Sequence, residues 1–380
     1  MMMSKLAYIL LIAVAVMIGA CSTPLVIPTT QFNSNLLVVE GLINTGSDST
    51  IITLSRTVLV SAKTTAKPET KAIITVENAT STVGTLTEIV NGTYASKGLN
   101  LDNTKQYRLR IKSSNGKMYL SDWVNAKVTP PIDSLGYNFT GPGLQIYANT
   151  HDAANNIHYY KYTYRETWQF HATNYTMYIS DGKTLNIRTP AQDIYSCFGS
   201  DSTTSIFLNS TATLSQDLTY QLPIVAIDST SEKVEIKYSI LLTQVALTAD
   251  AYQFWQNLKK NTEQLGSIFD AQPSSTLGNI HNIADATEPV IGYISVGTVQ
   301  RKRIYITRAQ VPLRWRIATY PPYCLVDTVF NPATPLINFP VQGYAIAPFG
   351  TGKQSGYMFV LPLCADCTLR GTKTQPIFWK

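Results

Sequence analysis

Two cysteines near the C-terminus, Cys364 and Cys367, are spaced as C-x-x-C in the stretch LPLCADC. This spacing occurs in half of a zinc site, in a thiol redox pair and in structural disulfides. Cys197 and Cys324 stand alone in the sequence and do not supply the further spacing of a zinc site. A redox pair is followed by a helix, whereas the TLRGTKTQ after Cys367 is not a helix pattern. The choice among the three depends on the compartment.

Motifs for catalysis or metal binding are absent from the sequence. It contains no G-x-S-x-G of a hydrolase, no H-E-x-x-H of a zinc protease and no EF-hand loop. The histidines follow no recognised spacing; they are His151, His158, His171 and His281. Acidic residues are sparse and scattered, so no carboxylate pair can be assigned to glycoside hydrolysis. The sequence predicts no catalytic residue, no metal site and no cofactor, and we expect a protein that is not an enzyme.

One long segment offers a candidate surface for ligand stacking. Aromatic and polar residues alternate from residue 158 to 171, which is typical of a strand. The aromatic face contains Tyr160, Tyr162, Tyr164, Trp168 and Phe170, and the other face contains Lys161, Thr163, Arg165, Thr167 and Gln169. The first four rings are candidates for stacking on a sugar or a peptide, because aromatic rings combine contact area with a polar handle. The alternative, that they face the core of a sheet, is favoured because one face of such a strand must be buried.

A basic cluster in VQRKRIYITR contains Arg301, Lys302, Arg303 and Arg308. It could hold an anionic ligand or a lipid headgroup, but a solvated hairpin turn is the more common arrangement and is what we expect. The formal charge of the chain is +6, and only 14% of its residues are charged. This mild basicity does not favour nucleic acid as a partner.

The N-terminus resembles a bacterial lipoprotein signal. Lys5 precedes an apolar run over residues 6–18 that is too short to span a bilayer comfortably. The following Ile18-Gly19-Ala20-Cys21 resembles a lipobox, so we predict a signal peptide over 1–20, lipidation of Cys21 and a tether over 21–35. Export favours disulfides among the other four cysteines. The pairing stays open, and a bond between Cys324 and one member of the C-x-x-C pair is the favoured arrangement.

Two β-rich modules are expected to follow. Residues 36–131 contain six to eight short β-branched runs with Asn-Gly turns at 91–92 and 115–116, a pattern that predicts a β-sandwich of immunoglobulin, fibronectin or carboxypeptidase-regulatory type. Pro130-Pro131 marks the boundary. Residues 132–380 contain longer antiparallel strands, which predict a barrel or curved sheet. One amphipathic helix is expected from an N-cap at Asp250 to a stop at Gly266.

Several stretches together resemble one family. YQFWQNLKKNTEQLGSIFDAQPSSTLGNIHN, EPVIGYISVGTVQRKRIYI and CADCTLRGTKTQPIFW are similar to Bacteroidetes lipoproteins grouped as domain of unknown function 4249. Nearly the whole chain shares the resemblance, which carries over no catalytic residues. It implies an outer-membrane lipoprotein beside a TonB-dependent transporter, with a role analogous to SusD in nutrient capture. Acidic residues often follow the lipid cysteine in surface-exported members, whereas Ser22 to Leu25 contain none.

The resulting expectation is a non-enzymatic outer-membrane lipoprotein. Its anchor is the N-terminal lipid, the cell surface is favoured over the periplasmic side, and its partners are a TonB-dependent β-barrel and an unidentified ligand, either a glycan, a peptide or a metal complex. The alternatives are a surface glycan-binding adhesin, a glycan-active enzyme, and a purely structural envelope protein. An enzyme would need two carboxylates across an aromatic cleft, and a structural protein would have no ligand-sized pocket.

Overall fold

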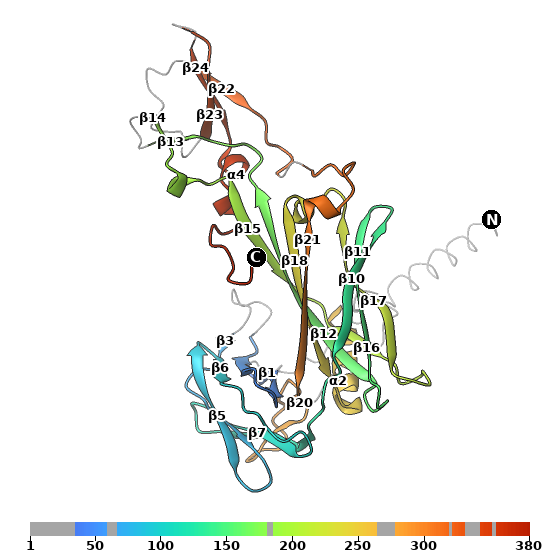
Figure 1. The fold of residues 1–380 in the computed structure, drawn as a ribbon. Helices are drawn as coiled ribbons and strands as arrows, with labels where there is room; N and C mark the ends of the chain where they lie inside the picture. The colour runs from blue at the N-terminus through green and yellow to red at the C-terminus, as the bar shows by residue number, and fades with distance from the viewer. Residues whose placement is uncertain are drawn as a thin grey trace, which may run out of the picture.

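The computed structural model describes residues 35–58, 67–180, 185–263, 278–318, 321–330, 343–351 and 355–380. The chain is mainly β, as the sequence predicts, and its described part includes one long helix (Figure 1). The predicted signal peptide, Cys21 and nearly all of the predicted tether lie outside the described residues. Within the described part, no helix combines the length and apolarity needed to cross a bilayer.

Eleven strands form the first sheet, here called the N-terminal sheet. They are β1 (Leu37–Asn44), β2 (Thr50–Arg56), β3 (Lys67–Pro68), β4 (Ile73–Glu77), β5 (Thr82–Val90), β6 (Thr93–Ser96), β7 (Gln106–Lys112), β8 (Met118–Ser121), β9 (Val124–Asn125), β19 (Ile280–Asn282) and β20 (Ser295–Gly297). The main path runs β19-β8-β7-β4-β5-β6-β2-β1-β20, and alternate side chains of these strands bury one hydrophobic cluster. Because β5 pairs with both β4 and β6, the sheet is continuous. A sandwich of two separate sheets is therefore not confirmed.

The two edge strands of this sheet come from much later in the chain. β19 pairs antiparallel with β8, and β20 pairs parallel with β1. The segment between them lies tightly against β1: Val39 N–H donates to the Ile291 carbonyl at 2.8 Å. Gly292 has a φ of +131°, and a Cβ there would lie 2.0 Å from the Val39 carbonyl oxygen. Only glycine fits this approach, so the sequence of the returning segment is constrained by the strand it joins.

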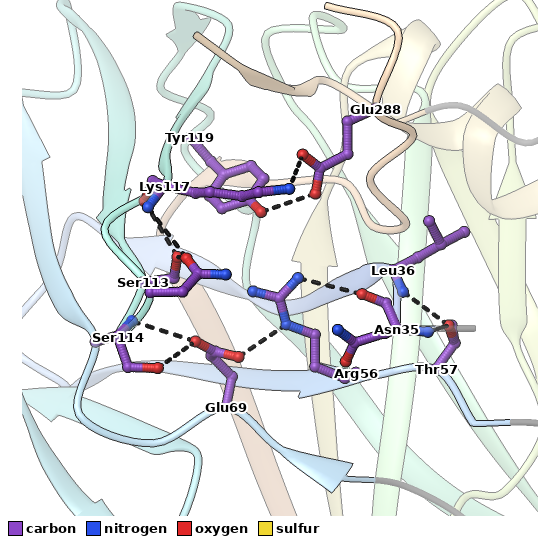
Figure 2. Close-up of polar contacts among 12 residues, drawn as sticks. Asn35, Leu36, Arg56, Thr57, Glu69, Ser113, Ser114, Lys117, Tyr119 and Glu288 are labelled. Carbon is purple, nitrogen blue, oxygen red and sulfur yellow. Dashed lines mark hydrogen bonds and ion pairs between the residues drawn. The ribbon is translucent and has the colours of Figure 1, made fainter. Parts of the chain in front are cut away.

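A buried ion pair lies at one end of the N-terminal sheet (Figure 2). Arg56 Nε on β2 donates to Glu69 Oε2 at 2.8 Å, and both side chains are at most 10% exposed. The Glu69 carboxylate also accepts from Ser114 N–H and Oγ, at 3.3 and 3.1 Å, while Arg56 Nη1 donates to the Asn35 carbonyl. Through these bonds the two charges link the start of β1, strand β2 and the β7–β8 hairpin, while Arg56 Nη2 stays buried without a hydrogen-bond partner among the described residues.

The same network holds the returning segment. Glu288 lies between β19 and β20 and accepts hydrogen bonds from Lys117 Nζ at 2.7 Å and from the Tyr119 hydroxyl at 3.0 Å (Figure 2). Asn282 on β19 also donates to this carboxylate. Burial would raise the pKa of Glu288, but these donors and the Lys117 charge outweigh burial and leave the pKa below its usual value. The charged carboxylate of Glu288 therefore links β8 to the segment that contributes β19 and β20 to the sheet.

Two further antiparallel sheets face each other above the N-terminal sheet (Figure 1). The central sheet contains β15 (Ser196–Ser202), β12 (Tyr159–His171), β18 (Lys237–Ala246) and β21 (Val299–Thr307) in that order, with β16 (Phe207–Ser210) also on β12. The smaller sheet contains β10 (Ile132–Thr140), β11 (Gly143–His151) and β17 (Leu218–Asp228). Their facing side chains bury the second hydrophobic cluster. This arrangement confirms the predicted curved antiparallel sheet with one helix.

The helix α2 (Ala249–Glu263) packs against β12 and β16, on the face of the central sheet turned away from the smaller sheet. Its first turn is capped by Thr248, whose Oγ1 accepts from Ala251 N–H at 3.2 Å, so the prediction of Asp250 as the N-cap is wrong. Ala251 and Phe254 are buried. The expected stop at Gly266 lies outside the described residues.

The end of the molecule away from the N-terminal sheet carries the remaining elements (Figure 1). They are the hairpin of β13 (Tyr178–Ser180) and β14 (Leu185–Ile187), the sheet of β22 (Asp327–Phe330), β24 (Gly356–Val360) and β23 (Tyr344–Phe349), and the short α4 (Pro362–Ala365). Short 3-10 turns connect strands at η1 (Pro190–Gln192), η2 (Glu232–Val234), η3 (Arg308–Gln310) and η6 (Cys367–Leu369).

Candidate functional site: a cavity beside Lys161

The four cysteines after Cys21 form two disulfides, as predicted from the resemblance of the N-terminus to a lipoprotein signal. Cys197 on β15 is bonded to Cys367, and Cys324 is bonded to Cys364. The favoured pairing of Cys324 with one member of the C-x-x-C motif is thus found. Each cysteine of the motif has a different partner, so the motif is neither half of a zinc site nor an internal redox pair. Together the bonds attach the chain around α4 to the edge of the central sheet.

The candidate stacking aromatics face the second hydrophobic cluster. Tyr160 and Tyr162 on β12 have no exposed surface, and Tyr164 and Trp168 pack against the same cluster. The Tyr160 hydroxyl donates to the Asp217 carboxylate, and burial together with that carboxylate raises the pKa of Tyr160 far above its usual value. Trp168 Nε1 donates to Glu232 at 3.3 Å. Tyr160 and Tyr162 therefore present no ring face to a ligand.

The opposite face of β12 borders a cavity of about 520 Å³, here called the Lys161 cavity. It lies where three parts of the fold meet: β1 and β20 of the N-terminal sheet, β12 and β18 of the central sheet, and α2. The segment 203–206 closes another side. Cavities of this size, with mostly apolar walls and a few polar groups, are typical of small-molecule sites.

Lys161 is the only cation that lines this cavity among the described residues. Its Nζ lies 3.1 Å from the ring centre of Trp255 on α2, a cation–π contact. Within the described part of the chain, no carboxylate lies within ion-pair distance of this ammonium. Burial lowers the pKa of Lys161 to about 8, and the charge of Glu40 on β1 partly opposes this shift. The ammonium is thus held in a partly desolvated position without a paired anion.

A second cavity of about 400 Å³ continues along the same face and is here called the Arg165 cavity. Thr163 and Thr203 line both cavities, and Arg165 and Arg301 line the second. The exposed Arg301 forms an ion pair with Asp48 of the N-terminal sheet, whereas Arg165 has no ion-pair partner in the described ranges. Lys161, Thr163 and Arg165 of β12 therefore line two adjoining cavities, which together are here called the trough.

The predicted hairpin turn over the basic cluster is wrong, because residues 301–303 lie inside strand β21. Strand alternation places Arg301 and Arg303 on one face of the sheet and Lys302 on the other. Lys302 Nζ donates to the carbonyls of Ile132 and Asp133, while Arg303 Nη1 donates to Ser239 and its guanidinium lies 3.6 Å from the ring centre of Phe378. Arg308 donates to the Trp315 carbonyl at 2.7 Å. Only Arg301 of this cluster reaches the trough.

The four histidines lie apart from the trough and from one another. His151 contacts Asp133, His171 contacts Glu235, His281 contacts Asp122 and His158 contacts Thr211. Within the described ranges, no three His, Cys, Asp or Glu side chains lie together so that they could hold a metal ion.

The sequence pattern placed Lys161, Thr163 and Arg165 on one face but did not identify them as a site. The signal was present in the alternation of β12, since a polar face opposite a buried aromatic face must meet water or a ligand. The pattern gave no indication that Trp255 and Glu40 lie beside these residues. These residues lie about a hundred positions away on either side and reach the cavity only through the tertiary fold.

Comparisons with known proteins identify the family. Curated protein sequences give no significant match. One solved structure, a candidate carbohydrate-binding protein from Bacteroides uniformis ATCC 8492, matches with 11% identity and a TM-score of 0.15, over 57% of this chain and 91% of that chain. A TM-score this low does not indicate a shared fold. The family model described as a domain of unknown function, DUF4249, matches residues 22–303, and the chain therefore belongs to this family.

Proposed function

We propose that this protein is a lipid-anchored, non-enzymatic binding protein of the outer membrane. In this proposal it works beside a TonB-dependent transporter and captures a nutrient before uptake, in a role analogous to SusD. The Lys161 cavity is the observation that carries the proposal, because it combines ligand size, apolar walls and an unpaired polar group. The lipobox-like sequence ending at Cys21 supports the anchor.

The position of the cavity suits a binding role. It lies on the seam between the N-terminal sheet and the central sheet, and ligand sites occur preferentially at such junctions between modules. Glu288 bonds the segment that leads into β20, one of the strands at this seam, to Tyr119 on β8. A preformed site loses less conformational entropy on binding than a flexible one.

Purification from the native membrane tests the partnership. The chain, tagged at its C-terminus, is extracted in mild detergent and its co-purifying proteins are identified by mass spectrometry. A large β-barrel transporter in stoichiometric amount is the expected result. The matched control is Cys21→Ala, which removes the lipid-bearing thiol and should leave the protein outside the membrane fraction.

Protease treatment of intact cells tests the orientation. A chain on the cell surface, the favoured side, is digested without lysis, while one that faces the periplasm is protected until the outer membrane is opened. Recovery of the wild-type protein without any β-barrel partner would contradict the transporter role. Membrane association of Cys21→Ala equal to that of the wild type would contradict the lipid anchor.

A further inference from the structure

The ammonium group of Lys161 points to the chemistry of the ligand. We propose that the Lys161 cavity binds the carboxylate of an organic acid, with Lys161 as its counter-ion and the apolar walls around its body. This inference deepens the proposed function and rests on it, since it names the class of ligand that the binding protein holds.

The charge balance of the cavity favours an anion. Lys161 on β12 contacts the ring of Trp255 on α2. The titratable group that faces it from β1 is Glu40, which lies beyond ion-pair distance, and the lining of the cavity from β18, β20 and segment 203–206 contains no charged side chain. In the adjoining cavity Arg165 is unpaired and Arg301 is neutralised by Asp48. From α2, the exposed Glu263 accepts a hydrogen bond from the N–H of Ile206, which lines the Lys161 cavity. Among the residues that line the trough, Lys161 and Arg165 are thus unpaired cations and Glu40 is an exposed carboxylate.

Desolvation makes this ammonium a strong binding group. A charge that is partly removed from water and left unpaired is unfavourable, and an opposite charge at hydrogen-bond distance relieves this cost. The ring of Trp255 offers only a cation–π contact, which leaves the N–H donors of Nζ available. A carboxylate supplies two acceptor oxygens for these donors.

The walls of the cavity accommodate the rest of such a molecule. Leu42, Ile206, Val245 and Leu247 supply apolar surface, and the hydroxyls of Thr163 and Thr204 supply donors and acceptors. A ligand with a carboxylate head and a short apolar body satisfies both parts. A purely apolar ligand would leave the ammonium unpaired and would cover it from water.

Binding can be followed at Lys161 itself. The lysines of the full mature chain are converted to ¹³C-dimethyl-lysine, and the NMR signal absent from Lys161→Met is assigned to Lys161. The probes are hexanoate and hexan-1-ol, which share their apolar body and differ in the carboxylate. Hexanoate is expected to raise the apparent pKa of Lys161 by at least about one unit, since a nearby anion favours the charged amine. Hexan-1-ol is expected to leave it unchanged.

The pH dependence of binding provides a second readout. With a pKa of about 8 for the free protein, Lys161 is about 90% charged at pH 7 and about 10% charged at pH 9. The affinity for hexanoate should therefore fall about tenfold between these pH values. Lys161→Arg should bind hexanoate without this fall, because arginine stays charged. The matched control is Lys97→Met, which removes an exposed cation of the N-terminal module and should bind as the wild type does.

The inference is overturned if hexanoate leaves the Lys161 signal unchanged, or if Lys161→Met, folded by circular dichroism, binds hexanoate as tightly as the wild type. Equal effects of hexanoate and hexan-1-ol would also overturn it. These failures are separate from failure of the proposed function, because co-purification with a transporter is measured on the unmodified chain. If the protein co-purifies with the β-barrel but does not bind hexanoate, the proposed transporter role stands and the proposed carboxylate ligand is excluded.

Discussion

The ion pair between Arg56 and Glu69 gives a prediction with a definite sign. We compare Arg56→Met, Glu69→Leu and the double variant with the wild type. In each single variant one charge stays nearly buried without its partner, since the side chains are only 5% and 10% exposed. Breaking a buried pair in this way costs about 3–5 kcal/mol of unfolding free energy. In the double variant no buried charge remains, and two apolar side chains replace the pair.

The neighbouring groups set the cost of the double variant. The Asn35 carbonyl and the Ser114 N–H and hydroxyl lose their partners, at 3.3, 3.3 and 3.1 Å. Both residues are exposed, so water can replace these bonds and the loss is about 2 kcal/mol or less. The two single losses together reach about 6–10 kcal/mol. The expected coupling between the positions is therefore about 4 kcal/mol or more.

Equilibrium urea unfolding measures these free energies, with fluorescence of Trp123 as the probe of the N-terminal sheet. Proton linkage adds a second readout. Burial alone would raise the pKa of Glu69, but the hydrogen bond and charge of Arg56 outweigh it and the pKa is lowered from 4.5. The wild type should then lose stability as the pH falls below about 4.5, because protonation ends the favourable interaction. In Arg56→Met the unpaired carboxyl should have a raised pKa, so acid should stabilise this variant relative to the wild type.

Additive losses in the double variant would refute the reasoning, because they would show that neither charge depends on the other. A wild-type pH profile parallel to that of Arg56→Met between pH 3 and 6 would refute the linkage argument in the same way.

The remaining predictions concern covalent and steric constraints. Replacing Cys197 and Cys367 by alanine should cost about 5 kcal/mol of cross-link stabilisation, and replacing Cys324 and Cys364 about 4 kcal/mol, because the bonds span 170 and 40 residues. Reduced wild type serves as the packing control, and a larger loss for the shorter loop would contradict the loop-entropy argument. Gly292→Ala should lower the thermal midpoint by several degrees, since its Cβ would meet a β1 carbonyl at 2.0 Å, and an unchanged midpoint would count against that contact.

Local patterns in the sequence account for much of the fold. Alternation located β12 and β18, and the apolar stripe located α2 to within two residues at its start. The compartment inferred from the N-terminus predicted disulfides, and geometry then selected the partner of Cys324. These successes share a cause: each depends on residues close in sequence or on the chemistry of one residue type.

Pairing between distant segments could not be predicted. β19 is only three residues long and carries no strand pattern of its own, yet it completes an edge of the N-terminal sheet. Its place is set by Glu288 and by the close approach at Gly292, which are tertiary contacts. The Lys161 cavity has the same origin, because its walls come from β1, β12, β18 and α2. The alternation within a strand predicts which of its faces is buried, but it does not predict which other strand pairs with it.

The return of β19 and β20 has a consequence for the order of folding. The chain passes between the N-terminal sheet and the central sheet three times: before β10, between α2 and β19, and between β20 and β21. The first module therefore gains both edge strands only after nearly 300 residues of the chain are available for folding. Until then β1 and β8 present open edges, which are sites for wrong pairing. Contacts of such long sequence separation form slowly, so these edges are expected to stay open during much of folding.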